Sequence, residues 1–243
     1  MMTLLLAVAL QDDPLAAEFL KAWKHPWAGF RPGSIVKMRQ VSKRPDIDAK
    51  GELVYRDETE ELSYSIVTQA GESPTLRIRS GDLSSDIPYF LQPPGWFRGK
   101  GERKGTESLK VGEITFLCDV TTFTLDGGKD LSQVTTVHAA AGAPVWAIKV
   151  RVETKANGKT NTADEERLVA VDQALKIGGR EVLCQVVEVL TEVTGGPTTI
   201  KKEWRSDEIP GRVARREQKV VQNGKDVAGA SLQMDVVSFE TKR

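Results

Sequence analysis

The feature that most constrains the fold of this chain is a repeated alternation of apolar and polar residues. Its clearest example is residues 146–153, where Trp146, Ile148, Val150 and Val152 are apolar and the positions between them carry alanine, lysine, arginine and glutamate. Successive side chains of a strand point to opposite faces, so each such run predicts a strand with one buried and one wet face. Burial on one face only is typical of antiparallel sheets.

Turn signals and one helix complete the predicted fold. Asn157-Gly158 and Asn223-Gly224 are typical hairpin turns between such runs. Near the N-terminus, Asp13 is a good N-cap and Pro14 suits the first helical position, and an apolar stripe with a spacing of four follows up to Pro26. The sequence therefore predicts a mostly β protein. Its core would be a large curved antiparallel sheet or incomplete β-barrel, with one N-terminal α-helix packed on it.

Residues 81–105 interrupt the strand pattern. This stretch is rich in glycine and contains Pro93-Pro94-Gly95, which does not fit a central strand, so a long loop is expected here. Its aromatic residues include Trp96 and Phe97, which would either cover a cavity as a flap or pin the loop onto the body of the protein.

The chain also resembles itself at an offset of 66 residues. Over residues 109–159, ten positions are identical to those of 175–225 without a gap, where chance gives roughly three. The match indicates an internal duplication in which residues 109–168 form one copy and residues 175–234 the other. Two copies are too few for a solenoid, so residues 12–243 are expected to form a single β-rich domain that contains the duplication.

The two cysteines, Cys118 and Cys184, occupy equivalent positions in the two copies. Each lies in a mostly apolar predicted strand, where a cysteine can serve as a small buried residue. In an exported chain a pair of cysteines can instead form a disulfide, so both states remain open. No third or fourth ligand lies at a spacing suited to zinc, and no metal site is expected.

Residues 1–11 point to export. An apolar run from Leu4 to Leu10 contains Ala7-Val8-Ala9, which has the small-x-small form of a signal-peptidase site. The alternative is a hydrophobic N-terminus that packs on the domain. With export, the protein would be periplasmic or secreted.

Composition and missing motifs exclude several functions. Lys plus Arg and Asp plus Glu number 34 each, and this zero net charge argues against nucleic acid as a partner. No apolar run reaches the roughly 18 residues of a membrane-spanning helix. His25 and His138 lie in no ligand pattern, and no nucleophile motif or phosphate loop is present. The sequence predicts no cofactor and no enzymatic activity, although a site within 81–105 would be the place to look for one.

The layout is similar to a known superfamily. A short apolar leader, one amphipathic helix and a long series of amphipathic strands resemble the bacterial lipoprotein carriers, the periplasmic lipoprotein localisation factors and their relatives. Residues 204–211, Trp-Arg-Ser-Asp-Glu-Ile-Pro-Gly, also resemble a pattern of uncharacterised exported proteins of planctomycete-like bacteria. The resemblance to the carriers implies an incomplete barrel whose concave face holds acyl chains.

These observations favour a non-enzymatic exported protein that binds a hydrophobic or lipid-like ligand on the concave face of its sheet. The predicted lining of that cavity is Trp146, Ile148, Val150, Trp96 and Phe97. The alternative is an envelope structural or protein–protein interaction module that binds another envelope protein and has no small-molecule ligand. A face filled by the helix would count against the first hypothesis.

Overall fold

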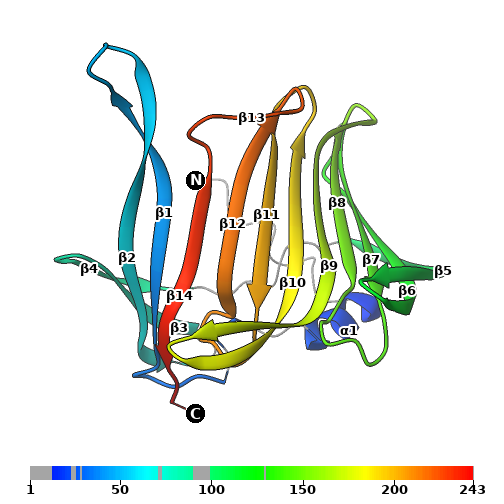
Figure 1. Ribbon diagram of the computed structural model, residues 1–243. Helices are drawn as coiled ribbons and strands as arrows, with labels where there is room; N and C mark the ends of the chain where they lie inside the picture. Colours follow the sequence, from blue (N-terminus) through cyan, green and yellow to red (C-terminus); the bar gives the residue numbers. More distant parts are fainter. Residues whose placement is uncertain are drawn as a thin grey trace. The chain divides into compact units, whose positions relative to one another are not determined.

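The computed structural model of the protein describes residues 13–22, 26–27, 29–70, 73–89, 99–128 and 130–242 (Figure 1). One helix and fourteen strands are found in this part of the chain. In chain order they are α1 (Pro14–Ala22), β1 (Ile35–Ile47), β2 (Leu53–Ala70), β3 (Ser73–Ser80), β4 (Leu83–Pro88), β5 (Lys100–Val111), β6 (Ile114–Asp126), β7 (Leu131–Ala139), β8 (Lys149–Ala156), β9 (Lys159–Ile177), β10 (Arg180–Val193), β11 (Thr198–Arg205), β12 (Val213–Gln222), β13 (Lys225–Asp226) and β14 (Leu232–Glu240).

The strands form one large antiparallel sheet that does not close into a barrel. Hydrogen-bonded neighbours follow the order β4-β3-β2-β1-β14-β12-β11-β10-β9-β8-β7-β6-β5, and β13 pairs with β12 outside this path. Most neighbours are also consecutive in the chain, as short hairpin turns require. The predicted fold class is therefore confirmed. No helix within the described ranges is long and apolar enough to cross a membrane.

The chain divides into two compact units. Unit 1 consists of residues 1–24, 92–168 and 191–195, and unit 2 of residues 25–91, 169–190 and 196–243. Strands β9 and β10 contribute to both. Each unit has its own hydrophobic core, and the single domain over 12–243 stays a prediction from the sequence.

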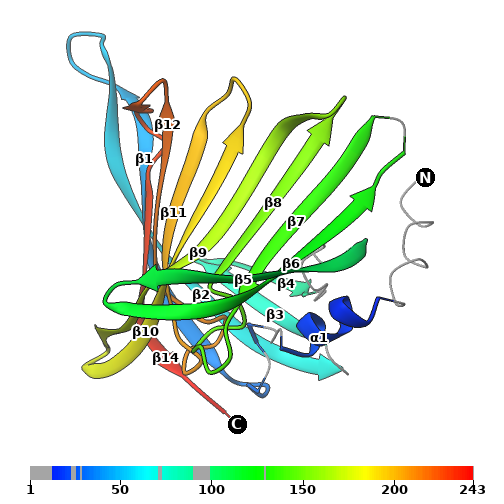
Figure 2. The same ribbon diagram turned by 90° about the vertical axis from the view of Figure 1, so that its right-hand side faces the viewer.

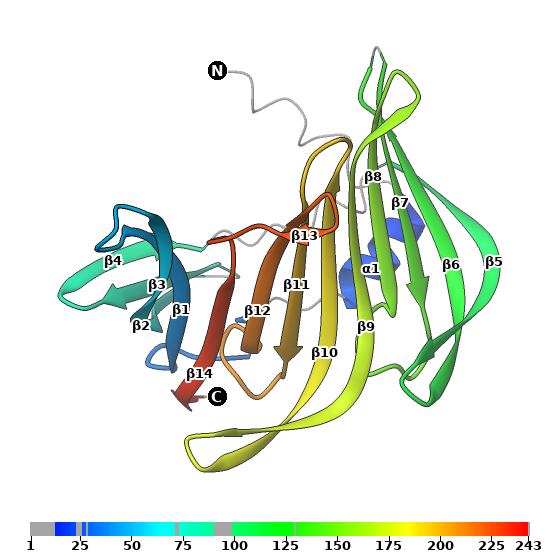
Figure 3. The same cartoon turned by 45° about the horizontal axis from the view of Figure 1, so that its top comes forward.

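Unit 1 is built around helix α1 and one face of its strands (Figures 2 and 3). Phe123 is fully buried, and Phe19 of the helix contacts it edge to face at a ring-centroid distance of 5.7 Å. Val137, Val150 and Val152 complete the core below the helix. The apolar side chains of the alternating run 146–153 therefore lie on the buried face of the strand.

Asp13 positions the start of α1, as the sequence predicted. Its Oδ1 accepts hydrogen bonds from the amides of Leu15 and Ala16, at 2.9 and 3.3 Å, and its Oδ2 accepts one from Gly101 of β5 at 2.7 Å. The Gly101 bond, more than the helix amides, holds the pKa of Asp13 below its ordinary value. The same carboxylate thus caps the helix and fastens it to the sheet.

Unit 2 has a separate core on one face of its part of the sheet. Val36, Ile66, Val182 and Met234 contribute to it from four strands. Its members outside the strands include Trp27, Phe30 and Ile209, which come from the segments that precede β1 and follow β11. Gly211 has a φ of +81°, and a Cβ there would lie 3.0 Å from the Trp27 ring, so this close approach requires glycine.

Equivalent positions of the predicted duplication have similar environments. Val111 and Ile177 are buried at the ends of β5 and β9, and each is followed by a glycine of positive φ. Cys118 and Cys184 are fully buried in the next strands, and the Sγ of each lies 3.7–3.8 Å from the carbonyl oxygen two residues earlier. The duplication itself stays a prediction from the sequence.

The predicted loop at 81–105 is shorter than expected. Leu83–Pro88 forms β4, joined to β3 by the turn Gly81-Asp82, and β5 begins at Lys100. A φ of +53° at Gly81 permits this two-residue turn. Pro88 is tolerated because it ends the outermost strand, where a missing N–H costs little. Trp96 and Phe97 lie outside the described residues.

Candidate functional site

The described part of the predicted cavity lining is packed. Trp146 and Val150 belong to the unit 1 core, and Phe19 of α1 lies 6.5 Å from Trp146 between ring centroids. Ile148 is 2% exposed. Trp146 and Val150 therefore pack in the core that contains the helix, Ile148 is buried, and their role as a ligand lining stays a prediction.

Both cysteines are free and buried. Of the two states that the sequence left open, the structure therefore has the buried free thiols and not the disulfide. Burial raises the pKa of Cys118, and the nearby Glu107 and Asp119 add to this effect. Burial raises the pKa of Cys184 to about 11, with a smaller contribution from Glu208. Neither thiol has the lowered pKa of a reactive cysteine.

His138 is a buried residue of β7 in unit 1. Its side chain is 9% exposed, and its Nε2 lies 2.9 Å from a carboxylate oxygen of Glu107. Its Nδ1 has no hydrogen-bond partner among the described residues. No group of three or more potential metal ligands occurs in the described ranges. His25 lies outside them.

A network of ion pairs lies in unit 2. Glu203 is only 7% exposed, and its two carboxylate oxygens each lie 2.7 Å from an arginine, Arg205 and Arg216. Burial opposes ionisation of Glu203, but the two arginines together outweigh it and keep its pKa below the ordinary value. Arg215 pairs with Asp235 at 2.5 Å. The network is thus partly buried and internally neutralised.

One concave site of the described residues is a cleft in unit 2 with a volume of about 590 Å³. It lies where β14 begins, between β1 and β12. The strand register places Val41, Gln233, Glu217 and Lys202 in one row across β1, β14, β12 and β11. Because Gln233 precedes the core residue Met234, this row lies on the face opposite the unit 2 core.

Charged side chains of both signs surround this row. Lys43 pairs with Asp57 across β1 and β2 at 2.6 Å, and Lys219 pairs with Asp226 at 3.1 Å. The ammonium of Lys202 lies 5.0 Å from the ring centroid of Trp204. The complete described lining is Val41, Ser42, Lys43, Asp57, Glu188, Ile200, Lys202, Glu217, Gln218, Lys219, Ser231, Leu232 and Gln233.

The chemistry of the cleft follows from this lining. Three lysines balance three carboxylates, and two glutamines and two serines add neutral donors and acceptors. The described lining includes three aliphatic side chains but no histidine or cysteine. Sequence reasoning missed the cleft because its residues come from six strands far apart in the chain, and none of them forms a local motif.

Comparison of the chain with models of protein families, with curated proteins and with solved structures finds no match.

Proposed function

We propose that the protein is a non-catalytic, exported binding protein whose unit 2 cleft takes an extended polypeptide segment of another envelope protein. The observation that carries this proposal is the lining of the cleft, which has charges of both signs, neutral amides and few aliphatic side chains. The apolar run and Ala7-Val8-Ala9 at the N-terminus support a periplasmic or secreted location.

A polypeptide segment matches this lining better than an acyl chain does. Its backbone offers a donor and an acceptor at nearly every residue, which Gln218, Gln233 and the serines can meet. Its charged side chains can pair with Lys202, Lys219 or Glu217 of the cleft lining. An acyl chain satisfies none of these groups, and covering them without partners costs free energy.

A second candidate is the binding of a hydrophobic or lipid-like ligand in the same cleft. Val41 and Ile200 support it, because they provide an aliphatic surface within the cleft. A volume of about 590 Å³ also lies in the range of small-molecule sites. The layout that resembles lipoprotein carriers is consistent with this candidate.

The proposal of a non-catalytic protein rests on the state of the nucleophiles. Both thiols are buried with raised pKa values, so they are protonated at neutral pH. The serines of the cleft, Ser42 and Ser231, have no histidine beside them in the described lining to act as a base.

The two candidates are separated by selection of ligands with the purified full chain. A library of random 12-residue peptides is selected on the wild type and on a Lys202→Glu, Lys219→Glu double variant. A Lys37→Glu, Lys176→Glu variant is the control, since both lysines are exposed strand residues of unit 2 outside the cleft. We expect enriched peptides that bind the wild type and the control equally and the cleft variant at least tenfold more weakly.

The lipid-like candidate is tested on the same preparations. Organic extracts of the purified protein are analysed by mass spectrometry, and binding of a fluorescent fatty acid is titrated. Suppose that a lipid co-purifies with the wild type but not with the cleft variant, and that no peptide is enriched. This result would refute the proposed function in favour of the second candidate. Absence of both ligands would refute the cleft as a binding site.

A further inference from the structure

The two outermost strands of the sheet, β4 and β5, differ in how their free edges are protected. Strand β5 has the sequence Lys-Gly-Glu-Arg-Lys-Gly-Thr-Glu-Ser-Leu-Lys-Val, with charges along its length and a bulge between Arg103 and Gly105. Lysines and bulges on an edge strand are the usual means by which proteins prevent pairing with other strands. This edge is therefore blocked.

Strand β4 lacks these protections. Its sequence is Leu-Ser-Ser-Asp-Ile-Pro, without lysine or arginine, and its pairing with β3 has no bulge. Leu83 and Ile87 are 77% and 45% exposed on the same face. The one charged residue, Asp86, is engaged by Arg77 of β3 through two hydrogen bonds of 2.7 and 2.8 Å. Among the described strands, β4 has a neighbour on one side only.

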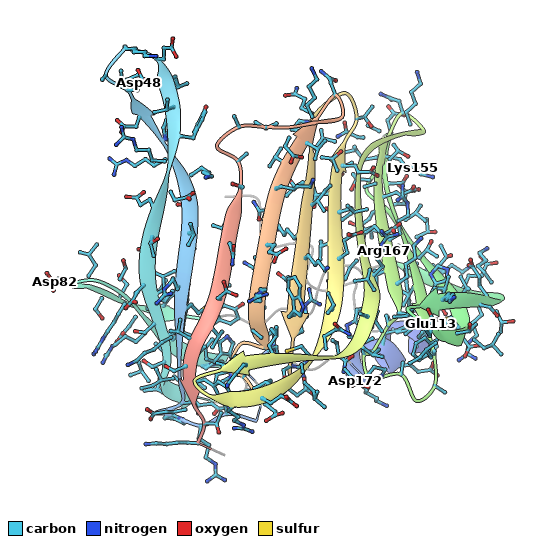
Figure 4. All side chains as sticks on the ribbon, viewed as in Figure 1. Asp48, Asp82, Glu113, Lys155, Arg167 and Asp172 are labelled. Atoms are coloured by element: carbon cyan, nitrogen blue, oxygen red, sulfur yellow. The ribbon has the colours of Figure 1, made fainter. Side chains whose placement is uncertain are left out.

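The register of the β3–β4 hairpin defines which backbone groups point outward. The amide of Tyr89 donates to the carbonyl of Pro74, so this pair is hydrogen-bonded within the hairpin. Antiparallel pairs alternate between hydrogen-bonded and non-hydrogen-bonded, so Leu83, Ser85 and Ile87 also use their backbone groups toward β3. The N–H and C=O groups of Ser84 and Asp86 therefore point away from the sheet. Asp82, labelled in Figure 4, lies in the turn at the tip of this hairpin.

We propose that β4 pairs with β4 of a second copy of this chain, antiparallel and about a two-fold axis at Ser85. In this register Leu83 contacts Ile87 of the partner subunit, and by symmetry Ile87 contacts Leu83 of the partner subunit. Ser84 and Asp86 then exchange their outward backbone groups across the axis, which forms about four backbone hydrogen bonds.

The side chains of β4 are complementary to themselves in this register. On one face, the two aliphatic pairs between Leu83 and Ile87 form next to the buried Leu76. This pairing would extend the unit 2 core, to which Leu76 belongs. On the other face each Asp86 lies beside Arg77 of its own chain and meets a serine across the axis, so no like charges are opposed. A heterologous partner strand would have to reproduce this pattern, whereas a second copy has it already.

The first test measures the mass of the full chain by analytical ultracentrifugation at micromolar to tens of micromolar concentrations. The wild type should sediment at twice the chain mass of 26.7 kDa. Ser84→Pro removes an N–H that β3 does not use, so this variant should keep its fold and become monomeric. Ser84→Ala keeps the N–H and should remain dimeric. A monomeric wild type, open-ended larger assemblies, or a proline variant that stays dimeric would each overturn the proposal.

The second test uses cross-linking and does not depend on a tight dimer. At the axis, residue 85 and its symmetry mate form a non-hydrogen-bonded pair with Cα atoms about 4.5 Å apart. This separation lies at the short end of what a disulfide spans. Under mild oxidation Ser85→Cys should cross-link at least tenfold faster than Ser108→Cys, a matched exposed serine on the protected edge strand β5. Equal rates would overturn the two-fold register.

Discussion

Replacement of Glu203 by glutamine tests the ion-pair network that lies above the unit 2 core. The carboxylate is 7% exposed and binds Arg205 and Arg216 through separate oxygens, both at 2.7 Å. Glutamine keeps the size of the side chain but removes the charge. The two guanidinium groups would then lie side by side without the anion that neutralises them.

The expected loss of stability follows from burial. Removal of one partner of a fully buried ion pair costs about 3–5 kcal/mol. Here Arg205 and Arg216 keep 29% and 34% of their side-chain exposure, so water screens part of the released repulsion. We therefore expect a decrease of about 2–3 kcal/mol in the free energy of unfolding, or about 5–10 °C in Tm for a chain of this size.

The assay is urea denaturation of wild type and variant at pH 7 and at lower pH. The folded-state pKa of Glu203 lies below its ordinary value of 4.5, so its ionisation stabilises the folded protein above that pH. This contribution is lost as the pH falls through the folded-state pKa. The difference between wild type and Glu203→Gln should therefore be constant near neutrality and become smaller below pH 4.5.

Glu61→Gln is the control, because Glu61 is 77% exposed and its pair with Arg39 is 4.0 Å long. This change should cost less than about 0.5 kcal/mol. If Glu203→Gln were as mild as the control, or if its effect did not change with pH, the reasoning about the buried carboxylate would be refuted.

Three further predictions concern the cores and the helix. Phe123→Ala removes the ring that Phe19 contacts and should cost about 3–5 kcal/mol in urea denaturation; a loss below 1 kcal/mol would mean that α1 does not fill this face. Asp13→Ala removes both the helix cap and the bond to β5 and should cost about 1–2 kcal/mol, whereas an unchanged midpoint would contradict the capping geometry. Cys118 and Cys184 should react with a thiol reagent at pH 8 only after unfolding in guanidinium; rapid labelling of the native protein would contradict their burial and raised pKa values.

Local features of the sequence predicted the elements and their buried faces. Alternation alone showed that Val150 and Val152 point into a core, because side-chain direction in a strand depends only on position. Asp13 and Pro14 likewise predicted the first turn of α1, since capping is a local interaction.

Pairing over long distances was not predictable in the same way. The cleft exists because the register brings Val41 next to Gln233, which is 192 positions later in the chain, and because β14 begins part of the way along β1. Which apolar face the helix would fill was also undetermined, so the alternation at Trp146 could not distinguish a packed core from an open lining. Strand β4 was missed because its six residues end in proline and carry no alternation strong enough to stand out.

The claim that the unit 2 cleft is the binding site is tested most directly by hydrogen exchange with a selected peptide bound. The account predicts slower amide exchange in three stretches that meet at the cleft, residues 41–43, 217–219 and 231–233. Exchange over residues 146–152, which lie in the packed core of unit 1, should not change. Protection confined to 146–152, or none at the three cleft stretches, would contradict the account.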